Sequence, residues 1–197
     1  MLPEKIIFVG VAVNLFCSLW YIRGVFRTGT KPNLISWFIW MLAPLIGFFL
    51  QLKADAGLSS LGVFWAGFGP FLVVIFCLFK KNVFWKIQFF DIVCGIFSIV
   101  ALALYVITND LGVSIIFAIF SDFLAYIPTF IKSWKYPETE TSSTYIGGVI
   151  NNTLALLIIK NWTFTIYLFP LYLVLANLIE ISFLYRRRIF RKRLTKF

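Results

Sequence analysis

Asp122 is the residue whose chemistry is hardest to explain by packing alone. It lies about halfway along an apolar run, and no basic residue falls within two helical turns of it in the sequence. Burial away from water disfavours the charged form of a carboxyl group, so such an acid can exchange a proton near neutral pH. We therefore expect Asp122 either to couple solute movement to protons or to hydrogen-bond a solute directly. The structural alternative is a protonated acid bonded to a neighbouring helix.

Seven further side chains with hydrogen-bonding groups stand at helical spacing within apolar runs. Residues three or four apart share one face of a helix, as Asn14 and Ser18 do. Polar groups inside a membrane segment mark binding sites by default because they are expensive to keep there. Asparagines and small residues also hold transmembrane helices together, which is the alternative for each. Together with Asp122, the predicted substrate-binding set comprises Asn14, Ser18, Trp40, Tyr126, Tyr145, Asn152 and Asn177.

Two more acids and four prolines fall inside the same apolar runs. Asp91 and Glu180 lie toward the ends of their runs, and we expect structural roles for them, paired with Lys86 or the arginine cluster at Arg186. A proline within a helix frees a backbone carbonyl and weakens one turn. The predicted bending points are Pro44, Pro70, Pro128 and Pro170.

The chain carries none of the residue patterns that common enzyme sites need. It contains no histidine, and its three cysteines, Cys17, Cys77 and Cys94, stand at unrelated spacings. HExxH, a glycine-rich phosphate loop and GxSxG are all absent from the sequence. We therefore predict no enzymatic activity, no cofactor and no metal site. Any proton coupling must use carboxylates.

The apolar composition of the chain indicates that membrane-spanning helices position these residues. Hydrophobic residues make up 61% of the chain, against roughly 45 to 50% in soluble domains. Charges separate seven apolar runs of about the ~20 residues that a membrane-spanning helix needs, and lipid cannot satisfy the free backbone groups of open strands. We expect the first run to be a retained span and not a cleaved signal. The predicted all-α membrane protein has helices at Ile6–Val25, Asn33–Leu52, Ser60–Phe79, Gln88–Thr108, Val113–Ile131, Thr144–Ile159 and Thr163–Tyr185.

Basic residues concentrate on alternate connections between these predicted spans. They gather after the first, third, fifth and seventh runs, most densely in the tail that follows Tyr185. Cytoplasmic loops carry such an excess, so the N-terminus is predicted outside and the C-terminus inside, in the plasma (inner) membrane. The tail is expected to contact anionic lipid headgroups and not nucleic acid.

The chain also repeats itself. Tyrosines and prolines recur 105 residues apart, as in Tyr21 with Tyr126 and Pro32 with Pro137, and the offset becomes 100 for Pro70 and Pro170. A single helix between the two copies makes both enter the membrane from the same side, as parallel transporter repeats do. The predicted organisation is a first three-helix bundle at 1–81, a linker helix at 82–110, a second three-helix bundle at 111–187 and a basic tail at 188–197.

This 3+1+3 arrangement, with YIPTFIKSWKYPETE after the first helix of the second copy, resembles the PQ-loop superfamily, which includes the SWEET sugar facilitators, cystinosin and the KDEL receptors. The Pro-Gln pair of that family corresponds to Pro128-Thr129 here, and the matching positions of the first copy are Arg23-Gly24. The resemblance implies a site near the bilayer midplane between the two bundles. It also implies a pocket role for Asn177, since SWEET-like proteins carry an asparagine on their seventh helix.

The sequence thus predicts a membrane transporter or facilitator of a small polar solute that works by alternating access between two bundles. Coupling to protons through Asp122 is one form of this prediction. Two alternatives stay open: a sorting receptor similar to the KDEL receptors, and a membrane scaffold that binds lipid without transporting anything.

Overall fold

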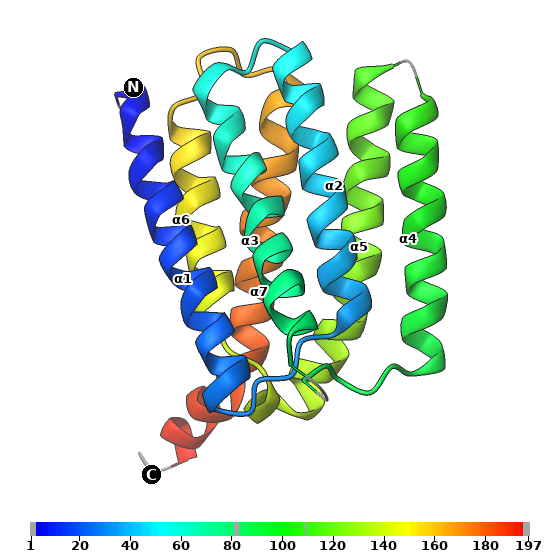
Figure 1. The fold of residues 1–197 in the computed structure, drawn as a ribbon. Coiled ribbons are helices and arrows are strands. Elements are labelled where there is room, and N and C mark those ends of the chain that lie inside the picture. The colour runs from blue at the N-terminus through cyan, green and yellow to red at the C-terminus, as the bar shows by residue number, and fades with distance from the viewer. Residues whose placement is uncertain (1–2, 81–82, 109, 195–197) are drawn as a thin grey trace.

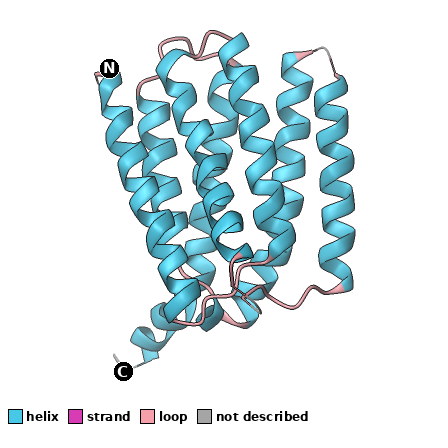
Figure 2. Cartoon of the chain, in the orientation of Figure 1, coloured by secondary structure: helices cyan, strands magenta, loops and turns pink. Residues whose placement is uncertain are grey.

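In a computed structural model, described for residues 3–80, 83–108 and 110–194, the chain consists of helices and connecting loops (Figure 2). No strand occurs in these ranges. Side chains are described as far as Arg186. Lys81 and the basic tail beyond Arg186, which the charge pattern assigns to the cytoplasmic side, therefore lie outside the described side chains. The α-helices are α1 (Ile7–Arg27), α2 (Leu34–Lys53), α3 (Ser60–Leu78), α4 (Phe89–Ile107), α5 (Leu111–Lys135), α6 (Ser143–Leu157) and α7 (Phe164–Leu194).

Six of these helices are long and apolar enough to cross a membrane, which makes the chain a multi-pass helical membrane protein. The remaining helix, α6, is shorter than these six and has 15 residues. At 1.5 Å per residue it spans about 22 Å. A bilayer core is about 30 Å thick. The run predicted at Thr144–Ile159 is thus helical, but its helix ends at Leu157.

Polar caps account for where several helices begin. The Oδ1 atom of Asn33 accepts hydrogen bonds from the backbone N–H groups of Ile35 and Ser36, at 3.1 and 3.3 Å, and starts α2. Asp110 does the same for α5 through the N–H of Val113, at 2.8 Å. Because of this cap, α5 begins two residues before the predicted Val113. Asp91 has a structural role, but as a cap and not through the expected pairing with Lys86: its carboxylate accepts the N–H of Gln88 at the start of α4.

The seven helices pass up and down, so that the described ends of the chain lie at opposite ends of the bundle (Figure 1). Odd-numbered helices run from the N-terminal end of the view toward the other, and even-numbered helices return. Helix α3 packs against both α1 and α2, and α7 packs against both α5 and α6. The two sets meet where α1 packs on α6 and α2 on α5, while α4 lies at one edge against α5 and α2.

Small residues allow the two sets of helices to approach closely. A Cβ atom built on Gly62 of α3 would lie 2.5 Å from the Cβ of Ala155 on α6. One built on Gly147 of α6 would lie 2.7 Å from the Cβ of Cys17 on α1. Transmembrane helices use such small residues because lipid supplies no hydrophobic drive for association, so close packing must hold them together.

We expect Gly62→Ala to lower the midpoint of thermal unfolding in detergent, because the added methyl group forces α3 away from α6. Overpacking of this kind costs about 1 to 3 kcal/mol. Gly47→Ala in α2 is the matched control, since its added Cβ would meet side-chain atoms only at 3.6 Å and beyond. Equal losses of stability in the two variants would contradict the proposed contact.

Candidate functional site

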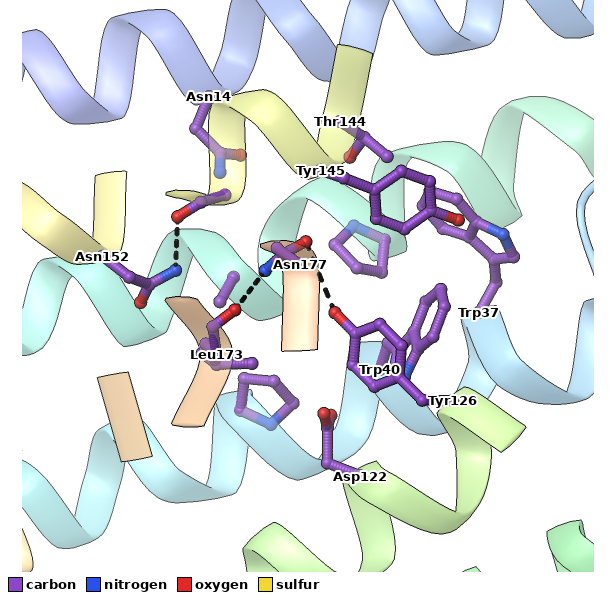
Figure 3. A pocket seen from close by; sticks show the side chains of 14 residues that line it. Asn14, Trp37, Trp40, Asp122, Tyr126, Thr144, Tyr145, Asn152, Leu173 and Asn177 are labelled. Carbon is purple, nitrogen blue, oxygen red and sulfur yellow. Dashed lines mark hydrogen bonds between the residues drawn. The ribbon is translucent and has the colours of Figure 1, made fainter. Parts of the chain in front are cut away.

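A buried cavity lies in the middle of the bundle and is lined by every described α-helix except α4 (Figure 3). Its volume is about 40 Å³, which is room for no more than a few water molecules. The lining residues are Asn14 of α1; Trp37, Trp40 and Pro44 of α2; Ala66 and Pro70 of α3; Asp122 and Tyr126 of α5; Thr144, Tyr145, Gly148 and Asn152 of α6; and Leu173 and Asn177 of α7.

The structure brings seven of the eight predicted substrate-binding residues to this cavity: Asn14, Trp40, Asp122, Tyr126, Tyr145, Asn152 and Asn177. Ser18 is the exception, because it lies one turn beyond Asn14, is fully buried and donates a hydrogen bond to the Asn14 side chain at 3.5 Å. Among the predicted bending points, Pro44 and Pro70 line the cavity. Pro128 and Pro170 lie within α5 and α7, outside the lining.

Asp122 is 1% exposed and receives one hydrogen bond from another helix. The hydroxyl of Tyr172 on α7 donates to its Oδ2 atom at 2.9 Å. The other carboxyl oxygen, Oδ1, has no hydrogen-bond partner among the described residues. Sequence reasoning missed Tyr172, which lies five residues before Asn177 and therefore about 140° away around the helix. Tyr172 and Asn177 therefore lie on different faces of α7, and helical spacing from Asn177 could not identify Tyr172.

Asparagines on α6 and α7 use the same local hydrogen bond. The amide nitrogen of Asn152 donates to the carbonyl oxygen of Gly148 at 2.9 Å, and that of Asn177 donates to Leu173 at 2.6 Å (Figure 3). Their side-chain oxygens are thereby left for other partners. The Asn177 oxygen accepts from the Tyr126 hydroxyl at 3.4 Å, whereas the Asn152 oxygen has no partner among the described residues.

The neighbouring Asn151 shows what a packing asparagine does in this protein. Its amide nitrogen donates to the carbonyl oxygen of Gly62 on α3 at 2.8 Å, and this joins two helices. It does not line the cavity. The two adjacent asparagines of α6 therefore divide between packing and the cavity, a difference that their residue type alone does not reveal.

Aromatic rings form one end of the cavity (Figure 3). The Trp40 ring centroid lies 4.3 Å from that of Tyr126, 5.5 Å from that of Trp37 and 6.3 Å from that of Tyr145. The indole nitrogens of both tryptophans and the hydroxyl of Tyr145 have no hydrogen-bond partner among the described residues. Trp37 is absent from the predicted set, although it stands three residues before Trp40 on the same helical face.

Contacts between connecting loops close the bundle at the end where the basic loops lie. The Lys31 N–H donates to the carbonyl oxygen of Thr139 at 2.9 Å, and the hydroxyls of Thr30 and Thr141 are 2.5 Å apart. The buried ammonium of Lys132 donates to the Lys31 carbonyl at 2.6 Å and pairs with the carboxylate of Glu140. The connection between α1 and α2 is thus bonded to α5 and to the connection between α5 and α6.

Glu180 corrects one prediction made from the sequence. We expected the arginine cluster at Arg186 to pair with it, but the guanidinium of Arg186 donates instead to the carbonyl oxygens of Ser133 and Phe183, at 3.1 and 2.7 Å. Glu180 is fully buried and accepts a hydrogen bond from the Ser133 hydroxyl. Arg186 follows Glu180 by six residues, which places it well over one turn further along α7.

A different contact joins the helices at the opposite end. Pro170 cannot donate a hydrogen bond to the carbonyl oxygen of Ile166 four residues earlier. The side-chain amide of Gln51 on α2 donates to that oxygen at 3.0 Å and replaces the missing bond. Both ends of the bundle are therefore bridged by hydrogen bonds between helices or loops, with the cavity between them.

Comparison of the chain with family models, with curated proteins and with solved structures found no match. The resemblance to the PQ-loop superfamily stays a prediction. Among the described residues no group of three or more His, Cys, Asp or Glu is placed to hold a metal ion. Fold and site together define a multi-pass helical membrane protein with a buried central cavity lined by aromatic and polar side chains.

We expect Glu140→Gln to destabilise the protein by about 3 to 5 kcal/mol, because it leaves the Lys132 ammonium buried without a counter-charge. The free energy of unfolding, followed by denaturant titration in mixed micelles, measures this change. Adding Lys132→Met removes the stranded charge, so the double variant is expected to recover most of the loss. Strictly additive losses would show that the two side chains do not interact.

Proposed function

We propose that this protein transports a small polar solute across the membrane by alternating access between two three-helix bundles. The observation that carries the proposal is the buried cavity, to which both bundles contribute and in which several buried polar atoms have no partner among the described residues. Buried polar groups in a membrane protein are otherwise nearly always satisfied. A transported solute that hydrogen-bonds these groups would account for their retention.

The packing of the helices supports two parallel repeats. Exchanging α1 with α5, α2 with α6 and α3 with α7 converts each observed contact within the first set into one within the second. The same exchange converts the contact of α1 with α6 into that of α5 with α2. This is the pattern expected when two repeats are related by an axis along the membrane normal, and α4 is then the linker that makes them parallel.

A seventh span by α6 and an outward N-terminus complete the proposal. Helix α6 packs against α1, α3 and α7, so its short length is shielded by its neighbours, and a bilayer adapts to such mismatch at modest cost. Basic residues gather at one end of the bundle, at Arg27, Lys31, Lys80, Lys86, Lys132, Lys135 and Arg186. The positive-inside rule makes that end cytoplasmic.

Transport requires this cavity to enlarge and to connect with each side of the membrane in turn. A cavity of about 40 Å³ is too small for a solute as large as a monosaccharide, so solute entry needs the bundles to separate at one end. The loop contacts of Lys31 and Lys132 would break for opening to the cytoplasm, and the Gln51 contact for opening to the other side. Pro44 and Pro70, which line the cavity, are placed where bending of α2 and α3 would change its shape.

Uptake into liposomes tests the transport proposal directly. The purified protein is reconstituted and offered sugars, amino acids and vitamins, with and without an imposed pH gradient. We expect time-dependent accumulation of at least one solute above protein-free vesicles. Absence of flux for the whole panel under every gradient would refute transport.

For the solute identified in this way, we expect Asp122→Asn to abolish the dependence of uptake on the pH gradient, because the amide cannot carry the proton. Asp91→Asn is the matched control: Asp91 is also buried, but it caps α4 outside the cavity. If uptake by Asp122→Asn kept the pH dependence of the unaltered protein, Asp122 would not be the coupling group.

The orientation has its own test. A fluorescent protein fused after the C-terminal residue should fold and fluoresce in bacterial cells, whereas alkaline phosphatase at the same position should be inactive, because the phosphatase folds only outside the cytoplasm. The same two fusions placed before the N-terminus should give the opposite result. Activity of the phosphatase at the C-terminus would reverse the assignment.

A further inference from the structure

We propose that the solute is a cation, an organic ammonium or guanidinium, whose positive charge is bound by the Asp122 carboxylate and the aromatic end of the cavity. This inference rests on the transport proposal above and names its substrate class. It follows from three features of the cavity: its charge, the orientation of its single carboxyl group and the type of surface beside that group.

The cavity has an acid and no base. Asp122 is the one Asp or Glu in its lining, and neither lysine nor arginine contributes to it. Lys132 is the one buried lysine of the described residues, and its ammonium is already held by Glu140 and by the carbonyl of Lys31. An anionic solute would therefore meet repulsion with no compensating charge. A cation would supply the counter-charge that the protein does not.

The carboxyl group is held so that one oxygen is available. Tyr172 fixes the Oδ2 atom by a hydrogen bond of 2.9 Å. The Oδ1 atom is buried, belongs to a residue that lines the cavity, and has no partner among the described residues. The titratable groups that face Asp122 are Tyr126 on its own helix and Tyr172 on α7, and no cation is among them.

The surface beside Asp122 suits a positive charge. Trp37, Trp40, Tyr126 and Tyr145 line the cavity together, and the faces of such rings attract ammonium and guanidinium groups, tryptophan most strongly. The attraction is stronger where water is excluded. The free oxygen of Asn152 adds a second acceptor for an N–H donor on the solute.

Asparagine oxygens and unbonded indole N–H groups could equally hold a neutral polar solute, and this is the competing outcome of the test. The two classes are separated by pairs of compounds with the same shape and different charge. Suitable pairs are choline with 3,3-dimethylbutan-1-ol, guanidinium with urea, and benzylammonium with benzyl alcohol. Binding is measured by the thermal shift of the purified protein in detergent and by calorimetry.

We expect at least one cation to raise the unfolding temperature and to bind about tenfold or more tightly than its neutral partner, the factor that 1.4 kcal/mol of extra attraction produces. Asp122→Asn should remove this preference and Asp122→Glu should retain it in part. Asp91→Asn, outside the cavity, should leave it unchanged. The inference is overturned if no cation binds, if the neutral partners bind as tightly, or if Asp122→Asn binds cations as the unaltered protein does.

The same compounds in liposomes separate this inference from the transport proposal. Flux of a neutral solute with no binding or flux of any cation would support transport and overturn the cation inference. Binding of a cation that depends on Asp122, with no flux of any compound, would support the cation site and overturn transport. Flux of the cation that binds would support both.

Discussion

Hydrocarbon offers no hydrogen bonds, and the arrangement of this bundle follows from that fact. Each polar group within a span needs a partner on another helix or must be bonded within its own. The polar side chains accordingly meet between the helices: Asn151 bonds α3, Gln51 bonds α7, and Tyr172 bonds Asp122. Not every polar atom of the described residues finds a partner. Some unpartnered atoms line the central cavity, and others, such as side-chain oxygens of Gln51, Asn151 and Glu180, lie outside it. Six helices converge on atoms that the described residues leave unbonded.

The two seams between the helix sets are built differently at corresponding places. Cys17 of α1 and Asp122 of α5 occupy equivalent positions in the proposed repeat, 105 residues apart. Cys17 lies against Gly147, where the α1 and α6 backbones approach closely and leave no space. Asp122 instead faces the cavity beside α2 and α7. At this position one seam is closely packed and the other carries an acid, so a transport cycle built on the proposed repeats would be asymmetric.

Local physics made most of the fold predictable. Apolar runs and capping residues such as Asn33 act within a few residues, so each predicted helix is present. Its ends lie within four positions of the prediction, except that α7 continues nine residues past Tyr185 to Leu194. Helical periodicity also selected seven residues that reach the cavity, although their roles remain predictions. Contacts between distant helices were beyond it. Tyr172 donates a hydrogen bond to Asp122, and Arg186 donates one to the Ser133 carbonyl. Both contacts depend on which helices are neighbours and on how each helix is rotated about its axis.

The hydrogen bond from Gln51 to the Ile166 carbonyl has a mechanical consequence. Pro170 makes α7 easier to bend at the same turn whose unpaired oxygen is held by α2. The turn that Pro170 weakens is therefore the same turn that Gln51 holds in place. If α7 bends at this turn, it must either carry the end of α2 with it or break the bond and expose two polar groups to an apolar surrounding. Bending of α7 at this turn would therefore be coupled to α2 through the Gln51 amide, in addition to the packing of α1 on α6 and of α2 on α5 that already joins the two sets.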